Sequence, residues 1–192
     1  MGRSSGPGEA MIENPENLPA GEQETSTEAT AGAVEAGWDD LDLGFSSSVR
    51  TKLDERGRLK MPTEFRSFID KKYSEGGGNF FITSLDGETA EIYPKREWLK
   101  RQAKIMSLPP SNETRMKLLD LDNLYGARVA MDPQGRLLIP EALRDEGVLA
   151  GDVMVSGEGD RLRVTSLKKL REQVKSRPVG AQDRDFMATI GL

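Results

Sequence analysis

The chain has 192 residues, room for one or two small domains, and contains neither cysteine nor histidine. This composition excludes disulfides, thiolate nucleophiles, zinc sites built from Cys or His, and imidazole as a proton carrier. No stretch approaches the roughly 20 apolar residues that span a bilayer, and the N-terminus lacks an apolar signal segment, so we expect a cytoplasmic protein with no membrane partner.

The formal net charge of −5 is unevenly distributed. Residues 1–44 carry one basic and ten acidic side chains, whereas residues 45–192 carry 26 basic and 22 acidic ones, so an acidic tail precedes a mildly basic body. The tail buries too little apolar surface to offset the entropy of ordering, and we expect disorder. Four apolar residues lie around the end of the tail: Trp38, Leu41, Leu43 and Phe45. We favour a disordered lead-in; the alternative is a short segment that docks on the body or on a neighbouring subunit.

A thirteen-residue signature occurs twice. Residues 54–66 align without a gap on residues 132–144, with Asp, Gly, Arg, Leu, Pro and the final Arg identical in both copies. A weaker match continues downstream, after a longer loop in the first copy. The duplication predicts one structural unit used twice. We expect a disordered acidic tail (1–44), a first repeat (45–108), a linker helix (109–126), a second repeat (127–175) and a C-terminal tail (176–192).

Each copy begins with a pattern typical of a β-hairpin that leads into a helix. Apolar residues alternate with polar ones at positions 49–53 and 59–61, on either side of turn chemistry at 54–57, and the second copy repeats this around residues 132–135. Pro62 and Pro140 suit a first helical turn, which predicts a longer helix in the first copy and a shorter one in the second. A second hairpin follows in each copy. From about Arg177 we expect a loose tail, with the alternative that Phe186, Met187, Ile190 and Leu192 form an anchor.

The two hairpins carry the candidate site. A ribbon with one apolar face and one guanidinium-bearing face suits the major groove of DNA, where arginine donates to guanine or phosphate. Carboxylates repel phosphate, so we expect each aspartate to accept a turn N–H or to orient the arginine four positions on. The candidate DNA-binding residues are Arg58, Arg136, Asp54, Asp132, Arg56, Lys60, Lys52, Arg50 and Arg128.

The two hairpins differ in charge. Lys52, Arg56 and Lys60 of the first copy correspond to uncharged residues in the second. We therefore expect the first copy to make more phosphate contacts and the second to support the fold and its register. A single Asp-x-x-Gly-Arg sequence is ordinary turn chemistry on a solvated strand, and it is the duplication that favours a binding role.

With these motifs the chain resembles the MraZ family of transcriptional regulators, built from two AbrB/SpoVT-like swapped-hairpin units. The matching segments are residues 53–59, 61–62, 65–66, 131–140 and 143–144, with shorter elements at 85–87, 93–94, 98, 107–109 and 126–127. The resemblance covers about residues 45–173. It implies a mixed α/β fold with a small double-psi-type barrel, a ring homo-oligomer, and association with the nucleoid. It also implies that Asp54, Arg58, Asp132 and Arg136 bind double-stranded DNA at promoter direct repeats of a division and cell-wall gene cluster.

Other functions remain open at this point. An AbrB-type antitoxin would wrap a toxin partner, and a structural ring would bind protein with a merely solvated basic face. An enzyme has the least support, because no nucleophile with its base and no phosphate loop appears, and we expect no cofactor, metal or small-molecule substrate. The acidic extension lies outside the resemblance. It is either a solubilising tail, the commoner use, or a DNA mimic that competes for the arginine face.

Overall fold

The structure is a computed structural model that describes residues 45–73, 78–145 and 149–191. Its described strands are β1 (Ser48–Lys52), β2 (Arg58–Lys60), β3 (Asn79–Thr83), β4 (Thr89–Pro94), β5 (Ala127–Ala130), β6 (Arg136–Leu138), β7 (Asp152–Glu158) and β8 (Arg161–Ser166). Its described helices are α1 (Thr63–Lys72), α2 (Lys95–Met106), α3 (Glu113–Tyr125), the 3-10 helix η2 (Glu141–Leu143), α4 (Leu167–Ser176) and α5 (Ala181–Thr189). None of these helices is long and apolar enough to cross a membrane.

The two copies exchange their first strands. Six strands form one antiparallel sheet in the order β1-β7-β8-β4-β3-β5, and β2 pairs with β6 in a separate sheet. Strand β1 of the first copy therefore pairs with β7 of the second, while β5 of the second copy pairs with β3 of the first. Neither copy holds a complete sheet by itself, and the two share one core.

This topology confirms the mixed α/β class and corrects two expectations. The strands on either side of each turn do not form a paired ribbon: in the first copy only a single bridge, between Leu53 and Leu59, joins them before they separate. The described strands also form two separate sheets instead of a closed small barrel. The physical reason is burial, since pairing β2 with β6 places Leu59 opposite Leu137 at the centre of the core, where both side chains are inaccessible.

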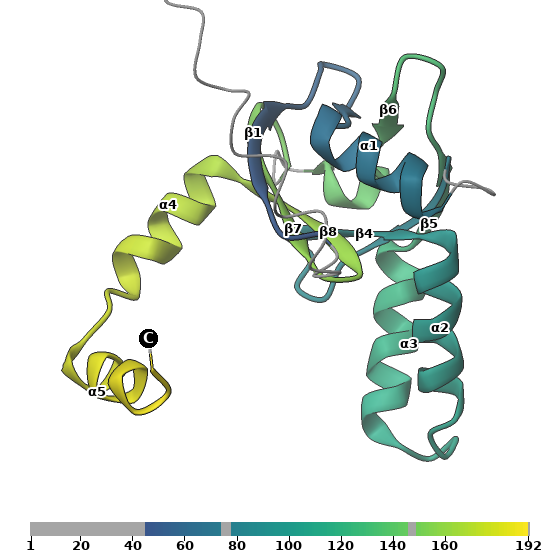
Figure 1. Ribbon diagram of the computed structural model, residues 1–192. Coiled ribbons are helices and arrows are strands. Elements are labelled where there is room, and N and C mark those ends of the chain that lie inside the picture. The colour runs from purple at the N-terminus through teal and green to yellow at the C-terminus, as the bar shows by residue number, and fades with distance from the viewer. Residues whose placement is uncertain (1–44, 74–77, 146–148, 192) are drawn as a thin grey trace, which may run out of the picture. The chain divides into compact units, whose positions relative to one another are not determined.

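The core lies between the six-stranded sheet and a second layer formed by β2, β6, α1 and η2 (Figure 1). Strand alternation turns one face of the sheet inward through Phe80, Ile82, Ala90, Ile92, Val153, Val155, Leu162 and Val164. Phe65 and Ile69 of α1 and Leu143 of η2 cover this face from the second layer. Each large side chain buried in this way contributes roughly 1.5–3 kcal/mol.

Helices α2 and α3 stand together at the β3 end of the sheet and project away from the second layer (Figure 1). The Trp98 ring stacks on Phe81 of β3 with centroids 3.6 Å apart. Asp122 of α3 accepts a hydrogen bond from the Thr83 hydroxyl (3.0 Å) and forms an ion pair with Arg101 of α2 (2.8 Å). These polar contacts fix the helix pair to the sheet. Helix α3 lies within the segment for which the sequence predicts a linker helix.

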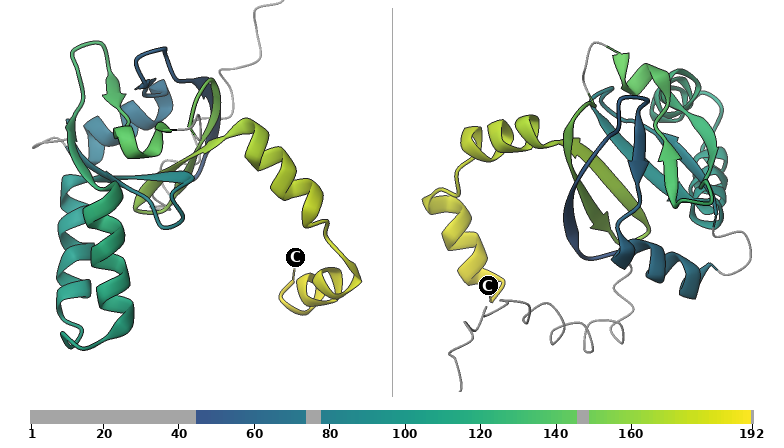
Figure 2. Two further views of the ribbon diagram at one scale, coloured as in Figure 1. Left: turned by 180° about the vertical axis from the view of Figure 1, so that it is seen from behind. Right: turned by 90° about the horizontal axis from the view of Figure 1, so that it is seen from above.

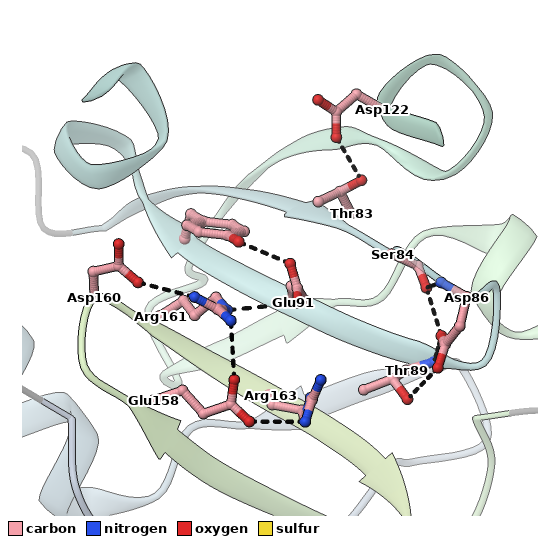
Figure 3. A network of polar contacts seen from close by, with 11 residues as sticks. Thr83, Ser84, Asp86, Thr89, Glu91, Asp122, Glu158, Asp160, Arg161 and Arg163 are labelled. Atoms are coloured by element: carbon pink, nitrogen blue, oxygen red, sulfur yellow. Dashed lines mark hydrogen bonds and ion pairs between the residues drawn. The ribbon is translucent and has the colours of Figure 1, made fainter. Parts of the chain in front are cut away.

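A buried ion pair joins the central strands of the two copies (Figure 3). Glu91 of β4 is only 2 % exposed; its carboxylate accepts a hydrogen bond from the Tyr93 hydroxyl (2.7 Å) and lies 3.5 Å from Nε of Arg161 on β8. Arg161 also reaches Glu158 and Asp160 on the same hairpin. Because the buried carboxylate has two donors nearby, its charge is compensated inside the sheet.

One end of the described chain differs from the favoured expectation. Phe45 is buried, pairs its backbone with Gly159 and packs against Phe68, so docking occurs at this residue. Trp38, Leu41, Leu43 and the whole acidic tail lie outside the described residues. The segment from Arg177 contains helix α5, in whose first turn the Gly180 N–H donates to Asp183 (2.7 Å), and no residue of α5 is buried.

Candidate nucleic-acid interface

The two signature turns lie at one end of the molecule, where each precedes one strand of the antiparallel β2–β6 pair. We call residues 54–57 the first turn and residues 132–135 the second turn. Both project from the end opposite the α2–α3 pair, and the reverse view agrees (Figures 1 and 2). Reciprocal backbone hydrogen bonds tie each turn to the residue that follows the other copy's short strand: the Met61 N–H donates to the Gly135 carbonyl (2.9 Å), and the Ile139 N–H donates to the Gly57 carbonyl (3.0 Å).

Each turn is closed by its own aspartate. Oδ1 of Asp54 accepts the backbone N–H groups of Arg56 (2.9 Å) and Arg58 (2.8 Å). The Gly57 N–H donates to the Asp54 carbonyl (2.9 Å), and Gly57 has a φ of 73°, which favours glycine. The second turn repeats this geometry. Oδ1 of Asp132 accepts from the backbone of Gln134 and Arg136, and Gly135 has a φ of 76°.

The arginines that directly follow the two turns differ in their side-chain contacts. Nε of Arg136 donates to Oδ2 of Asp132 (2.8 Å), and its Nη2 donates to the Gln134 side chain (3.3 Å). In the part of the chain that the structure describes, the Arg58 guanidinium makes no hydrogen bond or ion pair. Of the two predicted roles for the aspartates, both hold in the second turn and only the backbone role holds in the first.

Both aspartates are held in their charged form. The backbone N–H of Arg58 lowers the pKa of the Asp54 carboxyl below its usual range, and the charges of Arg58 and Arg136 add to this. For Asp132, desolvation acts to raise the pKa, but the hydrogen bonds from the side chain and backbone of Arg136 outweigh it and lower the pKa. Each turn therefore keeps an anionic anchor under its arginine at neutral pH.

The remaining candidate residues are only partly gathered at the turns. Arg56 is exposed within the first turn, and Lys60 of β2 lies directly opposite Arg136 in the register. Lys52 is exposed at the end of β1 that leads into the first turn. Arg50 forms an ion pair with Asp152 (2.7 Å). Arg128 is exposed on β5.

Strands β1 and β5 are the opposite edges of the six-stranded sheet. The fold therefore brings Arg58, Arg136 and Lys60 together and leaves Arg50 and Arg128 at two separate edges.

Two arginines absent from the predicted set also lie on the turns. A Cβ atom added to Gly57 would overlap the side chain of Arg144, and one added to Gly135 would lie 2.8 Å from Nη1 of Arg66. Each of these arginines belongs to the opposite copy from the turn that it covers. The signal in the sequence was present, because this arginine is the last identical position of the repeated signature.

The described residues contain no group of three or more acidic side chains placed to hold a metal ion. No protein-family profile matches the chain. A protein of Acidobacterium capsulatum, named transcriptional regulator MraZ, is 41% identical over 148 residues, which cover 77% of this chain and 99% of the relative. This chain belongs to the MraZ family.

Other MraZ proteins agree with this assignment. The protein of the same name in Koribacter versatilis is 37% identical over the same coverage, and that of Nitrosomonas europaea is 30% identical over 125 residues, which cover 65% of this chain and 82% of the relative. These MraZ relatives are named as transcriptional regulators and not as enzymes, in agreement with the expectation of a non-enzymatic protein.

Proposed function

We propose that this MraZ-family chain is a sequence-specific, DNA-binding transcriptional regulator that presents its two turns to the major groove. The observation that carries the proposal is the pair of aspartate-anchored turns, each followed by an arginine and each bonded to the other copy's chain, which project from the same end of the molecule. Guanidinium groups are the usual readers of guanine and strong partners of phosphate.

The spacing of the two arginines suits a duplex. In the β2–β6 register Arg58 lies opposite Leu138 and Arg136 lies opposite Lys60, so the two arginines are offset by two residues across neighbouring strands. Strand geometry places their Cα atoms roughly 8 Å apart. This is a little over two base-pair steps of about 3.4 Å, so both side chains can reach one short stretch of DNA.

The two turns have different roles in this proposal. Arg136 is already oriented by Asp132, which suits a geometrically demanding contact to a base. Arg58 is free of protein partners among the described residues, and Arg56, Lys52 and Lys60 are exposed close to it in the sequence. The first turn therefore supplies most of the phosphate contacts.

Assembly into a ring and binding to promoter direct repeats complete the proposal. One pair of turns makes only a small contact with DNA. Several subunits joined in one ring can bind several DNA repeats at once, and this binding is far tighter than that of a single subunit. Within the described chain, the C-terminal segment exposes Val174 of α4, Val179 between the two helices, Phe186 of α5 and Ile190 directly after it, a set of apolar side chains typical of a subunit contact. The repeats would lie in the promoter of a division and cell-wall gene cluster, and the regulator would be found at the nucleoid.

The decisive experiment is fluorescence anisotropy with DNA from upstream of this protein's own operon and with a scrambled duplex, over a salt series. We expect selective, salt-dependent binding that Arg58→Ala/Arg136→Ala abolishes. Lys104→Ala/Lys117→Ala, which removes two positive charges from the distant α2–α3 pair, is the matched control and should keep selectivity. Equal, weak binding of both duplexes that is unchanged by the arginine substitutions would instead favour a protein partner.

A further inference from the structure

The helices that follow β2 and β6 start at the opposite copy's turn. Met61 and Ile139, the residues before Pro62 and Pro140, donate their N–H groups to the glycine carbonyls of the second and first turns respectively. Helix α1 and the 3-10 helix η2 begin directly after these prolines. The pairing of β2 with β6 thus brings the first residues of each helix to the turn of the other copy.

Arg66 and Arg144 lie on the glycines of these turns. Gly57 and Gly135 are buried although the turns project from the molecule. The space that a Cβ atom would fill at Gly57 is taken by Cδ and Nε of Arg144, and at Gly135 the nearest group is the guanidinium of Arg66. Glycine is needed here for its positive φ and also because any larger residue would displace an arginine of the other copy.

The guanidinium groups keep donors available. Nε of Arg144 donates to the Ile139 carbonyl (2.8 Å), and its two Nη groups make no hydrogen bond among the described residues. Arg66 has a half-exposed side chain, and its Nε lies 3.9 Å from the carboxylate of Asp70. Both side chains have a fixed stem and an open guanidinium.

We propose that each turn is a composite site: Arg144 of the second copy completes the first turn, Arg66 of the first copy completes the second, and each guanidinium binds a phosphate of the DNA backbone. The inference rests on the proposed DNA-binding function and extends it to two residues. It explains why the signature ends in arginine in both copies, eight residues after the arginine of the turn.

The test separates charge from packing. Arg144→Met keeps an apolar side chain over Gly57 and removes the positive charge. Arg144→Lys keeps the charge and removes the planar guanidinium that donates two parallel hydrogen bonds. We expect Arg144→Met to weaken binding to the operon and scrambled duplexes by a similar factor of about ten. The slope of log binding constant against log salt concentration should become smaller in magnitude by about one. Arg144→Lys should restore the slope. An unchanged affinity and slope in both Arg144→Met and Arg66→Met would overturn the proposal.

Crosswise coupling provides a second, independent readout. In double-mutant cycles, Arg144→Met should couple more strongly with Arg58→Ala than with Arg136→Ala, and Arg66→Met should show the reverse preference. Coupling of each arginine to the turn of its own copy would also overturn the proposal. Wild-type protein that fails to select the operon duplex would reject the proposed function itself, whereas selective wild-type binding with no crosswise coupling would reject only the composite turns.

Discussion

Nε of Arg136 lies 2.8 Å from Oδ2 of Asp132, whereas the equivalent Arg58 makes no such contact with Asp54 among the described residues. The two copies of one signature thus hold their arginines differently. Arg136 has lost much of its rotational freedom before it meets a ligand, and Arg58 can still adjust to one.

This difference predicts unequal effects of substitution. Arg58→Ala should weaken binding to operon and scrambled DNA alike, by about tenfold, with a salt slope smaller by about one, because a phosphate contact is lost. Arg136→Ala should mainly reduce the ratio of the two affinities. Anisotropy titrations at several salt concentrations measure both quantities. A much larger loss of non-specific affinity in Arg136→Ala than in Arg58→Ala would contradict this ranking.

The aspartate anchors predict a low-pH limit for the turns. The pKa of Asp54 is lowered first by the backbone N–H of Arg58, and that of Asp132 is lowered by Arg136 despite desolvation. Because both folded-state values lie below the unfolded value of about 3.9, each aspartate's contribution to stability is present above that value and lost as the pH falls through the folded pKa. NMR titration of the two carboxyl carbons measures the midpoints, and values at or above about 3.9 would rule this out.

The turn glycines predict a difference between two alanine substitutions. Gly57 and Gly159 both have a positive φ, but only at Gly57 would a Cβ atom meet another side chain, that of Arg144. Gly159→Ala should therefore cost about 1 kcal/mol of unfolding free energy from its backbone conformation, and Gly57→Ala about 1–3 kcal/mol more. Urea denaturation measures both costs. Adding Arg144→Ala to Gly57→Ala should recover part of the difference, and equal costs for the two glycines would count against the contact.

The buried ion pair predicts which surface arginine matters for stability. Arg161→Ala leaves the Glu91 carboxylate buried with the Tyr93 hydroxyl and should cost about 2–4 kcal/mol (Figure 3). Arg163→Ala is the matched control on the same strand, because Arg163 is half-exposed and its one ion pair among the described residues is with Glu158, so it should cost at most about 1 kcal/mol. Thermal and urea unfolding of the two variants give the comparison. Similar stabilities would mean that Glu91 does not depend on Arg161.

The exposed C-terminal helices predict a role in assembly. Phe186→Glu/Ile190→Glu places charges on two exposed apolar positions without removing any side chain from the described core. If these residues form a subunit contact, the double variant should have a lower mass in light scattering and an unchanged circular dichroism spectrum. A mass equal to that of the wild type would exclude this surface from the interface.

Local patterns in the sequence predicted local structure well. Alternation at residues 49–53 gave a strand with Val49 and Leu53 facing the core, and Asp54 to Gly57 gave the turn with its aspartate bonded to backbone N–H groups. The same patterns could not choose the partner of β1. Strand β1 could pair with β2 in a hairpin or with β7 of the other copy, and both pairings turn the same residues of β1 inward. The packing of Leu59 against Leu137 distinguishes the two pairings.

The sequence by itself determined the duplication, the positions of the strands, the two anchored turns and the arginines that follow them. Each of these depends on neighbouring residues: strand period, turn chemistry and the identity of repeated positions. Only the tertiary structure decided which strands the two copies exchange and the placement of Arg66 and Arg144 on the turns of opposite copies. These features depend on which distant surfaces bury one another, and that free energy is carried by no single stretch of the chain.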